Sequence, residues 1–302
     1  MARLISTSYK MVAMVSEYTP KRVVSLQPSA TATIAAIGQL DRIVACTKYC
    51  AEICPDVSQS GAVIVEDSWT AQAAQIIPLK PDLVIASVPY QEKAVQEILK
   101  AGSRFLGLAP HTLADIYVDM ATIAGMLGVA ERGDELIAHM RQQIEVVRSR
   151  TDGGTRPRVF CEEWGRPLIA SQPWVAELVE AAGGEFIGKP GSQISSEEVL
   201  AANPDVVVAA WCGAGDRVPL EKIVRVREWE KMHAVRCGRV YCVRDEFLNT
   251  PAHTLMDGLR ALAAAIHPER FPAAHGLRCI RQEQAAGEPQ HPYADYSEYG
   301  NG

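Results

Sequence analysis

Three cysteines spaced four residues apart, Cys46, Cys50 and Cys54, are the side chains of this sequence best suited to bind a transition metal. Thiolate is a soft ligand, and on a helix this spacing would place the three sulfurs on one face. However, the sequence has no CxxC pair and no ordered histidine nearby, as zinc sites usually have, and Pro55 restricts the backbone beside Cys54. Two interpretations of Cys50 stay open: a soft contact to a ligand or its metal, or an idle thiol.

Acid–base chemistry would need paired carboxylates. The sequence has two tight pairs at the ends of apolar runs, Glu162-Glu163 and Asp245-Glu246, but such pairs are also common as solvated loop charges. A GxxxxGK pattern is followed by Pro190 rather than by the Ser or Thr that a phosphate loop needs. The sequence contains no GxSxG or HExxH motif. We therefore assign no catalytic residue and expect a protein that is not an enzyme.

Aromatic residues fall just after several apolar runs that we expect to be strands. They are scarce, since Phe, Trp and Tyr make up 6% of the chain. In a parallel α/β sheet the carboxyl ends of the strands form the ligand crevice, and aromatic rings there supply flat apolar walls. We therefore expect a large, flat ligand. The expected contacts are five residues after strands and one in a loop: Tyr49, Tyr90, Trp164, Trp211 and Phe247, and Trp69.

The elements that position these residues form two similar halves in tandem. Pro81-Asp82 and Pro204-Asp205 each precede a short apolar run, LVIAS and VVVAA, of the kind found in buried parallel strands. An amphipathic stretch of helical period lies ahead of each run, so strand, helix and strand follow in order twice. The sequence predicts an α/β fold of two Rossmann-like lobes, with central parallel sheets and a ligand cleft between the lobes.

A long helical stretch separates the two halves. Apolar residues recur at helical spacing, and Gly125, Gly128 and Gly133 permit a break near its middle. We expect an N-terminal lobe at 21–112, a long helical connector at 113–150, a C-terminal lobe at 156–272 and a loosely attached polar tail at 273–302. A helix is stiff, so this connector predicts a small rocking motion of the lobes rather than wide closure.

Composition and charge exclude several classes of protein. The net charge of −6 is spread without blocks, which argues against nucleic acid as a partner. No apolar run approaches the roughly 18–20 residues of a membrane span, so we expect none. The first residues show no secretory signal, and eight cysteines suit a reducing compartment. The expected location is cytoplasmic, or periplasmic or surface-anchored if a leader has been removed.

Six segments between residues 21 and 272 carry a resemblance to a known family. They are RVVSLQPSATATIAAIGQLDRIVACTKYC, LKPDLVIAS, APHTLADI, CEEWGRPLIASQPWVAELVEAAGG, NPDVVVAAWCG and GRVYCVRDEFLNTPAHTLMDGLRALAAAIHP. These segments resemble the cobalamin-type, class III substrate-binding proteins of ABC importers, which share a fold with siderophore- and haem-binding proteins. The resemblance implies two α/β lobes bridged by a long helix. It implies that a corrinoid, or another tetrapyrrole or metal chelate, is held between them as ligand, with no cofactor required.

The same resemblance assigns roles to single residues. It implies that Tyr49 and Trp69 contact the ligand, and that Cys50 occupies a position that is often Cys in members without a signal sequence. Asn249 matches the Asn of an FNRPGPR-like motif, but both arginines of that motif are threonine in this chain. Two polar anchors of the family motif are therefore absent from this sequence.

The resemblance also implies docking on an ABC permease through one carboxylate on each lobe. Glu197 occupies the second-lobe position, whereas Ala74 stands at the first-lobe position. One of two charge contacts is missing, so we expect weaker docking than an ordinary importer protein shows. An alternative from another class is a cytosolic metallocofactor-handling protein, or an enzyme, that uses Cys50 on a metal.

Overall fold

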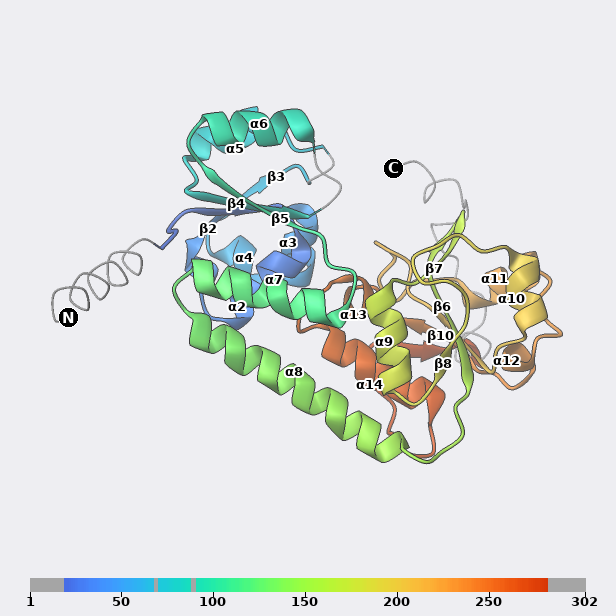
Figure 1. Ribbon diagram of the computed structural model, residues 1–302. Coiled ribbons are helices and arrows are strands. Elements are labelled where there is room, and N and C mark those ends of the chain that lie inside the picture. The colour runs from blue at the N-terminus through green and yellow to red at the C-terminus, as the bar shows by residue number, and fades with distance from the viewer. Residues whose placement is uncertain (1–18, 68–69, 88–90, 282–302) are drawn as a thin grey trace. The chain divides into compact units, whose positions relative to one another are not determined.

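The computed structural model describes residues 19–67, 70–87 and 91–281 (Figure 1). The chain divides into two compact units: unit 1 contains the residues up to 110 and 114–139, and unit 2 contains 111–113 and the residues from 140 onward. Each unit has its own sheet with helices packed against it. In the described ranges, no helix combines the length and the apolar character that crossing a bilayer requires.

Unit 1 is built on a five-stranded sheet in which all neighbouring strands are parallel. The strands lie in the order β3-β2-β1-β4-β5. Their bounds are β1 Val23–Ser25, β2 Ile43–Thr47, β3 Val63–Val65, β4 Leu83–Ser87 and β5 Arg104–Leu108. β4 is the LVIAS run, and every one of its residues is buried, as the sequence predicts for a parallel strand covered on both faces.

Helices cover both faces of this sheet. Their bounds are α2 Pro28–Ala36, α3 Lys48–Ile53, α4 Asp56–Gln59, α5 Ala73–Ile76 and α6 Glu92–Lys100. Successive residues of a strand point to opposite faces, so Ile85 of β4 packs in the same core as Ile34 of α2. Its neighbour Val84 packs instead with Ile98 of α6. Figure 1 shows α5 and α6 on one side of the sheet and α2 and α3 on the other.

Two helices, α7 Leu113–Met126 and α8 Ala130–Thr151, occupy the stretch predicted to be a helical connector. They are separated at Gly128, where φ is +72°, a left-handed conformation that favours glycine. The break is therefore found at one of the three glycines that the sequence offers for it. α8 has 22 residues and passes from unit 1 into unit 2. The residue ranges expected for the lobes, connector and tail remain predictions.

Unit 2 is built on a six-stranded mixed sheet. Its strands lie in the order β11-β10-β9-β6-β7, with β8 paired to β6. The bounds are β6 Arg158–Gly165, β7 Leu168–Ala170, β8 Glu185–Phe186, β9 Val206–Ala209, β10 Val240–Val243 and β11 Leu277–Cys279. β6, β8, β9 and β10 form a parallel centre, whereas β7 and β11 run antiparallel to their neighbours.

The two antiparallel strands are not predicted by the sequence. β7 returns along β6 directly after the turn at Arg166-Pro167, so the two strands form a hairpin. β11 lies in the stretch predicted to be a loosely attached polar tail, yet its Arg278 is paired with Cys242 of β10. Each strand has three residues, which is too short for the period-two alternation that reveals a strand. The expectation of loose attachment is wrong for this part of the tail.

Helices and a large apolar core complete unit 2. Their bounds are α9 Pro173–Ala181, α10 Ser196–Ala202, α11 Leu220–Val226, α12 His233–Arg236, α13 Glu246–Asn249 and α14 Leu255–Ile266. The rings of Phe160 and Trp229 meet edge to face in this core, with centroids 6.5 Å apart. α10 begins with a capping box, because the Ser195 and Glu198 side chains each bond the backbone N–H of the other residue.

A substitution at Gly258 tests the close packing of α14 against α13. A Cβ at Gly258 would lie 2.2 Å from the Phe247 carbonyl oxygen, and no side-chain rotation can relieve a clash with backbone. We expect Gly258→Ala to lower the free energy of unfolding by roughly 1–3 kcal/mol, as overpacking does. Urea denaturation followed by circular dichroism measures this change.

Gly125→Ala in α7 is the matched control. A Cβ there meets nothing within 4 Å, and alanine favours the helix over glycine by roughly 1 kcal/mol. This variant should therefore be as stable as the unaltered protein or more so. Equal losses of stability in both variants would contradict the packing described for Gly258.

Candidate ligand-binding edges of the two units

The carboxyl ends of three parallel strands meet at one edge of the unit 2 sheet. Glu163 lies near the end of β6, Cys212 follows β9, and Asp245 follows β10. Backbone bonds join these ends, since Cys212 N donates to Glu163 O over 3.2 Å. The Asp245 carboxylate accepts from the N–H groups of Gly213 and Gly215 at 2.7 and 2.9 Å. We call this group the unit 2 edge, and it is the kind of edge at which open α/β sheets generally bind ligands.

Two of the predicted tryptophans lie at the unit 2 edge in different environments. Trp164 is half-buried on the β6–β7 hairpin, and its Nε1 donates to Arg166 O over 2.9 Å. Trp211 is only 3% exposed and packs in the core of unit 2. Its Nε1 donates to Glu162 Oε1 over 2.8 Å. Trp164 is therefore partly exposed at this edge, whereas Trp211 is enclosed in the core.

Three titratable groups at this edge are partly withdrawn from water. Glu163 accepts from Gln172 Nε2 over 2.8 Å and from the Cys212 thiol over 3.8 Å. Burial raises the pKa of Glu163, although these two bonds act in the opposite direction. Burial also raises the pKa of Cys212, and the negative charges of the neighbouring Glu163 and Asp245 raise it further. Burial likewise raises the pKa of Asp245 above its ordinary value.

The short helix α13 brings two further predicted residues to this region. Phe247 is 9% exposed, with the Arg244 guanidinium 5.9 Å and the His275 ring 6.1 Å from its ring centroid. Asn249 Nδ2 donates to Ala210 O, just after β9, over 2.7 Å. Its Oδ1 is buried and has no hydrogen-bond partner among the described residues. The structure thus brings Trp164, Trp211, Phe247 and Asn249 into one unit, and their roles toward a ligand remain predictions.

Tyr49 and Cys50 lie in the first turn of α3, directly after the carboxyl end of β2, and we call this place the unit 1 edge. Cys50 is the residue that the sequence offers as a metal contact. Cys50 has no exposed surface and packs in the core of unit 1. Its N–H donates to Thr47 Oγ1 over 3.1 Å, and its thiol lies 3.6 Å from Ser25 O. Contact with a ligand metal would require this sulfur to leave the core. Among the described residues, no three His, Cys, Asp or Glu side chains are arranged to hold a metal ion.

Cys46 and Cys50 form a buried, coupled pair of thiols. The hydrogen bond with Cys50 and burial both raise the pKa of Cys46. Burial also opposes ionisation of Cys50, but hydrogen bonds from Cys46 and two threonines outweigh it and lower the pKa of that thiol to about 6. Cys54 lies outside this pair and is partly exposed, and burial raises its pKa.

The remaining predicted aromatic residues belong to unit 1. Tyr49 is half-buried in α3, and the ammonium group of Lys48 lies 4.7 Å from its ring centroid. Trp69 and Tyr90 lie outside the described residues. Of the three aromatic contacts predicted for unit 1, Tyr49 lies among the described residues. It is found just after the carboxyl end of β2.

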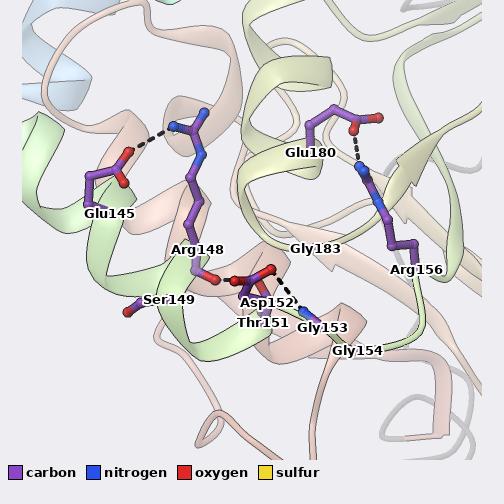
Figure 2. A pocket seen from close by; sticks show the side chains of 10 residues that line it. All are labelled: Glu145, Arg148, Ser149, Thr151, Asp152, Gly153, Gly154, Arg156, Glu180 and Gly183. Carbon is purple, nitrogen blue, oxygen red and sulfur yellow. Dashed lines mark hydrogen bonds and ion pairs between the residues drawn. The ribbon is translucent and has the colours of Figure 1, made fainter.

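A cavity of about 490 Å³ lies at the end of α8, away from the predicted residues (Figure 2). Two ion pairs line it, Arg148 with Glu145 at 2.8 Å and Arg156 with Glu180. Asp152 bonds the N–H of its own neighbour Gly153. The side chains of both ion pairs are about half exposed. Such pairs contribute little to the stability of the fold, because water screens their charges. Four of the charged lining groups are thus paired with each other, and none of the lining residues is one that the sequence predicts to contact a ligand.

Residues 23–246 match the sequence profile of a family described as "Periplasmic binding protein". The chain belongs to this family. Members of the family are binding proteins rather than enzymes, which agrees with the absence of a catalytic assignment from the sequence. The family name gives no support to a cytoplasmic location, so that expectation is not sustained.

Curated relatives of this periplasmic binding protein align with most of its length. An ABC transporter substrate-binding lipoprotein of Bacillus subtilis is 24% identical over 83% of this chain and 82% of its own. A cobalamin-binding protein of Halobacterium salinarum is 26% identical over 82% of this chain and 70% of its own. A vitamin B12-binding protein of Vibrio cholerae is 24% identical over 85% of this chain and 94% of its own.

Solved structures confirm the predicted fold class. A periplasmic haem-binding protein of Pseudomonas aeruginosa superposes with a TM-score of 0.75 at 21% identity, over 86% of this chain and 98% of that one. The periplasmic vitamin B12-binding protein of Vibrio cholerae gives a TM-score of 0.67 at 22% identity, over 82% and 97%. Two α/β lobes of the class III type are therefore shown for this periplasmic binding protein.

The structure also contains a buried ion pair that the sequence does not indicate. Arg227, directly after α11, makes an ion pair with Glu162 at 2.7 Å. The sequence marks Glu162 as half of an acidic pair, but Arg227 lies 65 residues away and no spacing rule connects the two. Only the folded sheet brings them together. The local sequence signal for the buried carboxylate is the apolar run RVFCE, which ends in Glu162.

Native-state labelling of the thiols tests the burial of Cys50. Iodoacetamide should modify Cys237 first, because that side chain is exposed, whereas Cys46, Cys50 and Cys161 are buried. The low pKa of Cys50 favours the reactive thiolate, but alkylation requires access to the sulfur. Mass-spectrometric mapping of peptides over time measures both rates, and labelling in denaturant confirms that every cysteine can react. Modification of Cys50 as fast as Cys237 would contradict the buried position.

Proposed function

We propose that this periplasmic binding protein binds a corrinoid, or a closely related tetrapyrrole metal chelate, as the substrate-binding component of an ABC importer. The observation that carries this proposal is the alignment of more than four fifths of the chain with relatives named for cobalamin or vitamin B12. The lipoprotein relative named for an ABC transporter supports the transport role. The ligand would be cargo, and the protein requires no cofactor of its own for this task.

The chemistry of the two edges supports a ligand recognised mainly by apolar area. Tyr49 in unit 1 and Trp164 in unit 2 are half-buried aromatic residues at the carboxyl end of a strand. Flat rings bury large area at low entropic cost. The carboxylates of Glu163 and Asp245 are already hydrogen-bonded within the chain. A large, flat macrocycle fits this combination better than a small polar solute does.

The burial of Cys50 argues against the alternative of a metallocofactor-handling protein or enzyme that uses this thiol on a metal. Cys50 is enclosed in the core of unit 1, where Thr47 and Ser25 surround its sulfur. A haem ligand remains an alternative within the same class of cargo, since a haem-binding protein shares the fold. Titration with both ligands separates these two.

Docking on an ABC permease is the second part of the proposal. Glu197 is exposed in the first turn of α10, where its carboxylate can reach a partner. Ala74, at the position where the family resemblance implies a second acid, is exposed on α5. One charged contact would then be made by unit 2 and none by unit 1. We propose a permease contact that is weaker and more asymmetric than two carboxylates would give.

Truncating Trp164 tests the proposed ligand wall. Trp164→Ala should weaken cyanocobalamin binding by roughly 1–3 kcal/mol, the range for burying one large aromatic side chain. Trp164→Phe keeps a flat ring and should lose less. Isothermal titration calorimetry with cyanocobalamin, and separately with haemin, gives the affinities. Unchanged affinity in Trp164→Ala would remove this residue from the wall, and no binding of either ligand by the unaltered protein would refute the proposed function.

Removing the charge of Glu197 tests the docking contact. Glu197→Gln should weaken binding to the ABC permease of the same organism, reconstituted in nanodiscs, and Ala74→Glu should strengthen it. Both effects should shrink as salt is added, because exposed charges are screened. Glu230→Gln removes an exposed carboxylate elsewhere in unit 2 and is the control. Equal binding by Glu197→Gln and the control variant would show that Glu197 is not a docking residue.

A further inference from the structure

Among the described residues, Glu162 is the one Asp or Glu that is buried, and it has no exposed surface. A buried carboxylate without a partner is strongly disfavoured, because the interior does not replace its hydration. Arg227 compensates this charge through two parallel hydrogen bonds. Its Nη1 donates to Glu162 Oε2 and its Nη2 to Glu162 Oε1, each over 2.7 Å. Such bidentate bonding fixes the direction of the two groups as well as their distance.

This ion pair also holds two parts of the unit 2 edge. Trp211 Nε1 donates to Glu162 Oε1 over 2.8 Å, which sets the orientation of the indole. Arg227 Nη2 also donates to Gly165 O, in the β6–β7 hairpin, over 3.2 Å. The Arg227 guanidinium lies 4.8 Å from the centroid of the Trp229 ring, which restrains it further. This salt bridge therefore connects three places in unit 2: β6, Trp211 after β9, and the end of α11.

The Trp211 ring and the hairpin are in direct contact. A Cβ at Gly165 would lie 2.6 Å from the Trp211 ring, so the indole packs against backbone with no room between them. Trp164 is the residue before Gly165 and is half-buried. A change in the tilt of the Trp211 indole would therefore move the hairpin and the Trp164 ring with it.

Stability alone does not account for this arrangement. Apolar side chains of similar volume stabilise a core as well as a buried ion pair does, and often better. However, apolar side chains cannot accept a hydrogen bond from the Trp211 N–H or donate one to Gly165 O. The distinctive contribution of the pair is therefore the orientation of these two groups.

We propose that Glu162 and Arg227 are positioning residues for ligand binding. They fix the Trp211 indole and the β6–β7 hairpin, and through them they set the angle at which Trp164 meets a flat macrocycle. The inference rests on the proposed function, because that function assigns Trp164 to the ligand wall. The orientation itself exists without ligand and can be measured separately.

The test replaces the whole pair so that no charge is left buried alone. The double variant Glu162→Met with Arg227→Met keeps the core filled, and the protein is labelled with 5-fluorotryptophan. We expect its Tm to stay within a few degrees of the unaltered protein. The ¹⁹F signals of Trp211 and Trp164, assigned from Trp→Phe variants, should shift or broaden without ligand. The Kd for cyanocobalamin should rise about tenfold or more.

Two further variants separate positioning from stability. Leu259→Ala opens a cavity in α14 of the same unit, so it should lower Tm but keep the Kd and the ¹⁹F spectrum. If the double variant fails to fold, Arg227→Lys keeps the charge but loses the bidentate geometry, and it should show the same spectral change and weaker binding.

The outcomes distinguish the two proposals. Unchanged Trp211 and Trp164 signals in the double variant or Arg227→Lys would overturn the positioning role, whether or not a ligand binds. Changed signals with an unchanged Kd would also overturn it. Failure of the unaltered protein to bind cyanocobalamin or haemin would refute the proposed function instead, while the ¹⁹F spectra would still report on the orientation of the edge.

Discussion

The need to cover short parallel strands on both faces determines most of this architecture. Strands such as β4 and β9 are buried at every residue, so helices must pack on each side of the sheet. Parallel pairing then directs every carboxyl end of the central strands to the same edge. Residues that follow different strands therefore lie close together although they are far apart in the sequence. In this way Trp211 after β9 and Asp245 after β10 share an edge with Glu163.

Polar side chains at these edges are largely used by the chain itself. Asp245 bonds two backbone N–H groups of the loop after β9, and Glu163 bonds Gln172. Such bonds fix loops that would otherwise pay conformational entropy whenever a ligand binds. Tyr49 and Trp164 are half-buried and add aromatic surface beside these fixed loops. A rigid, preorganised edge of this kind suits a binding protein, whose task is recognition and release without chemical change.

The sequence predicts features that depend on local pattern and misses those that depend on distant partners. The buried strands, the helical stretch and its break at Gly128 follow from composition and period, and the structure contains all of them. β7 and β11 are too short to show a period, and β11 forms because β10 offers it an edge. Trp211 follows a strand, as predicted, but its partner Glu162 turns it into the core. Nothing near Arg227 in the sequence indicates the ion pair.

The contact between Gly165 and Trp211 has a genetic consequence. Every single-base change of a glycine codon that alters the amino acid introduces a side chain with a Cβ, and at position 165 that atom would lie 2.6 Å from the indole. No one-step mutation that replaces this glycine is therefore neutral while the tryptophan remains. The glycine can diverge only in lineages where residue 211 has first become smaller. The two positions should thus be inherited as a pair, even though 45 residues of chain separate them.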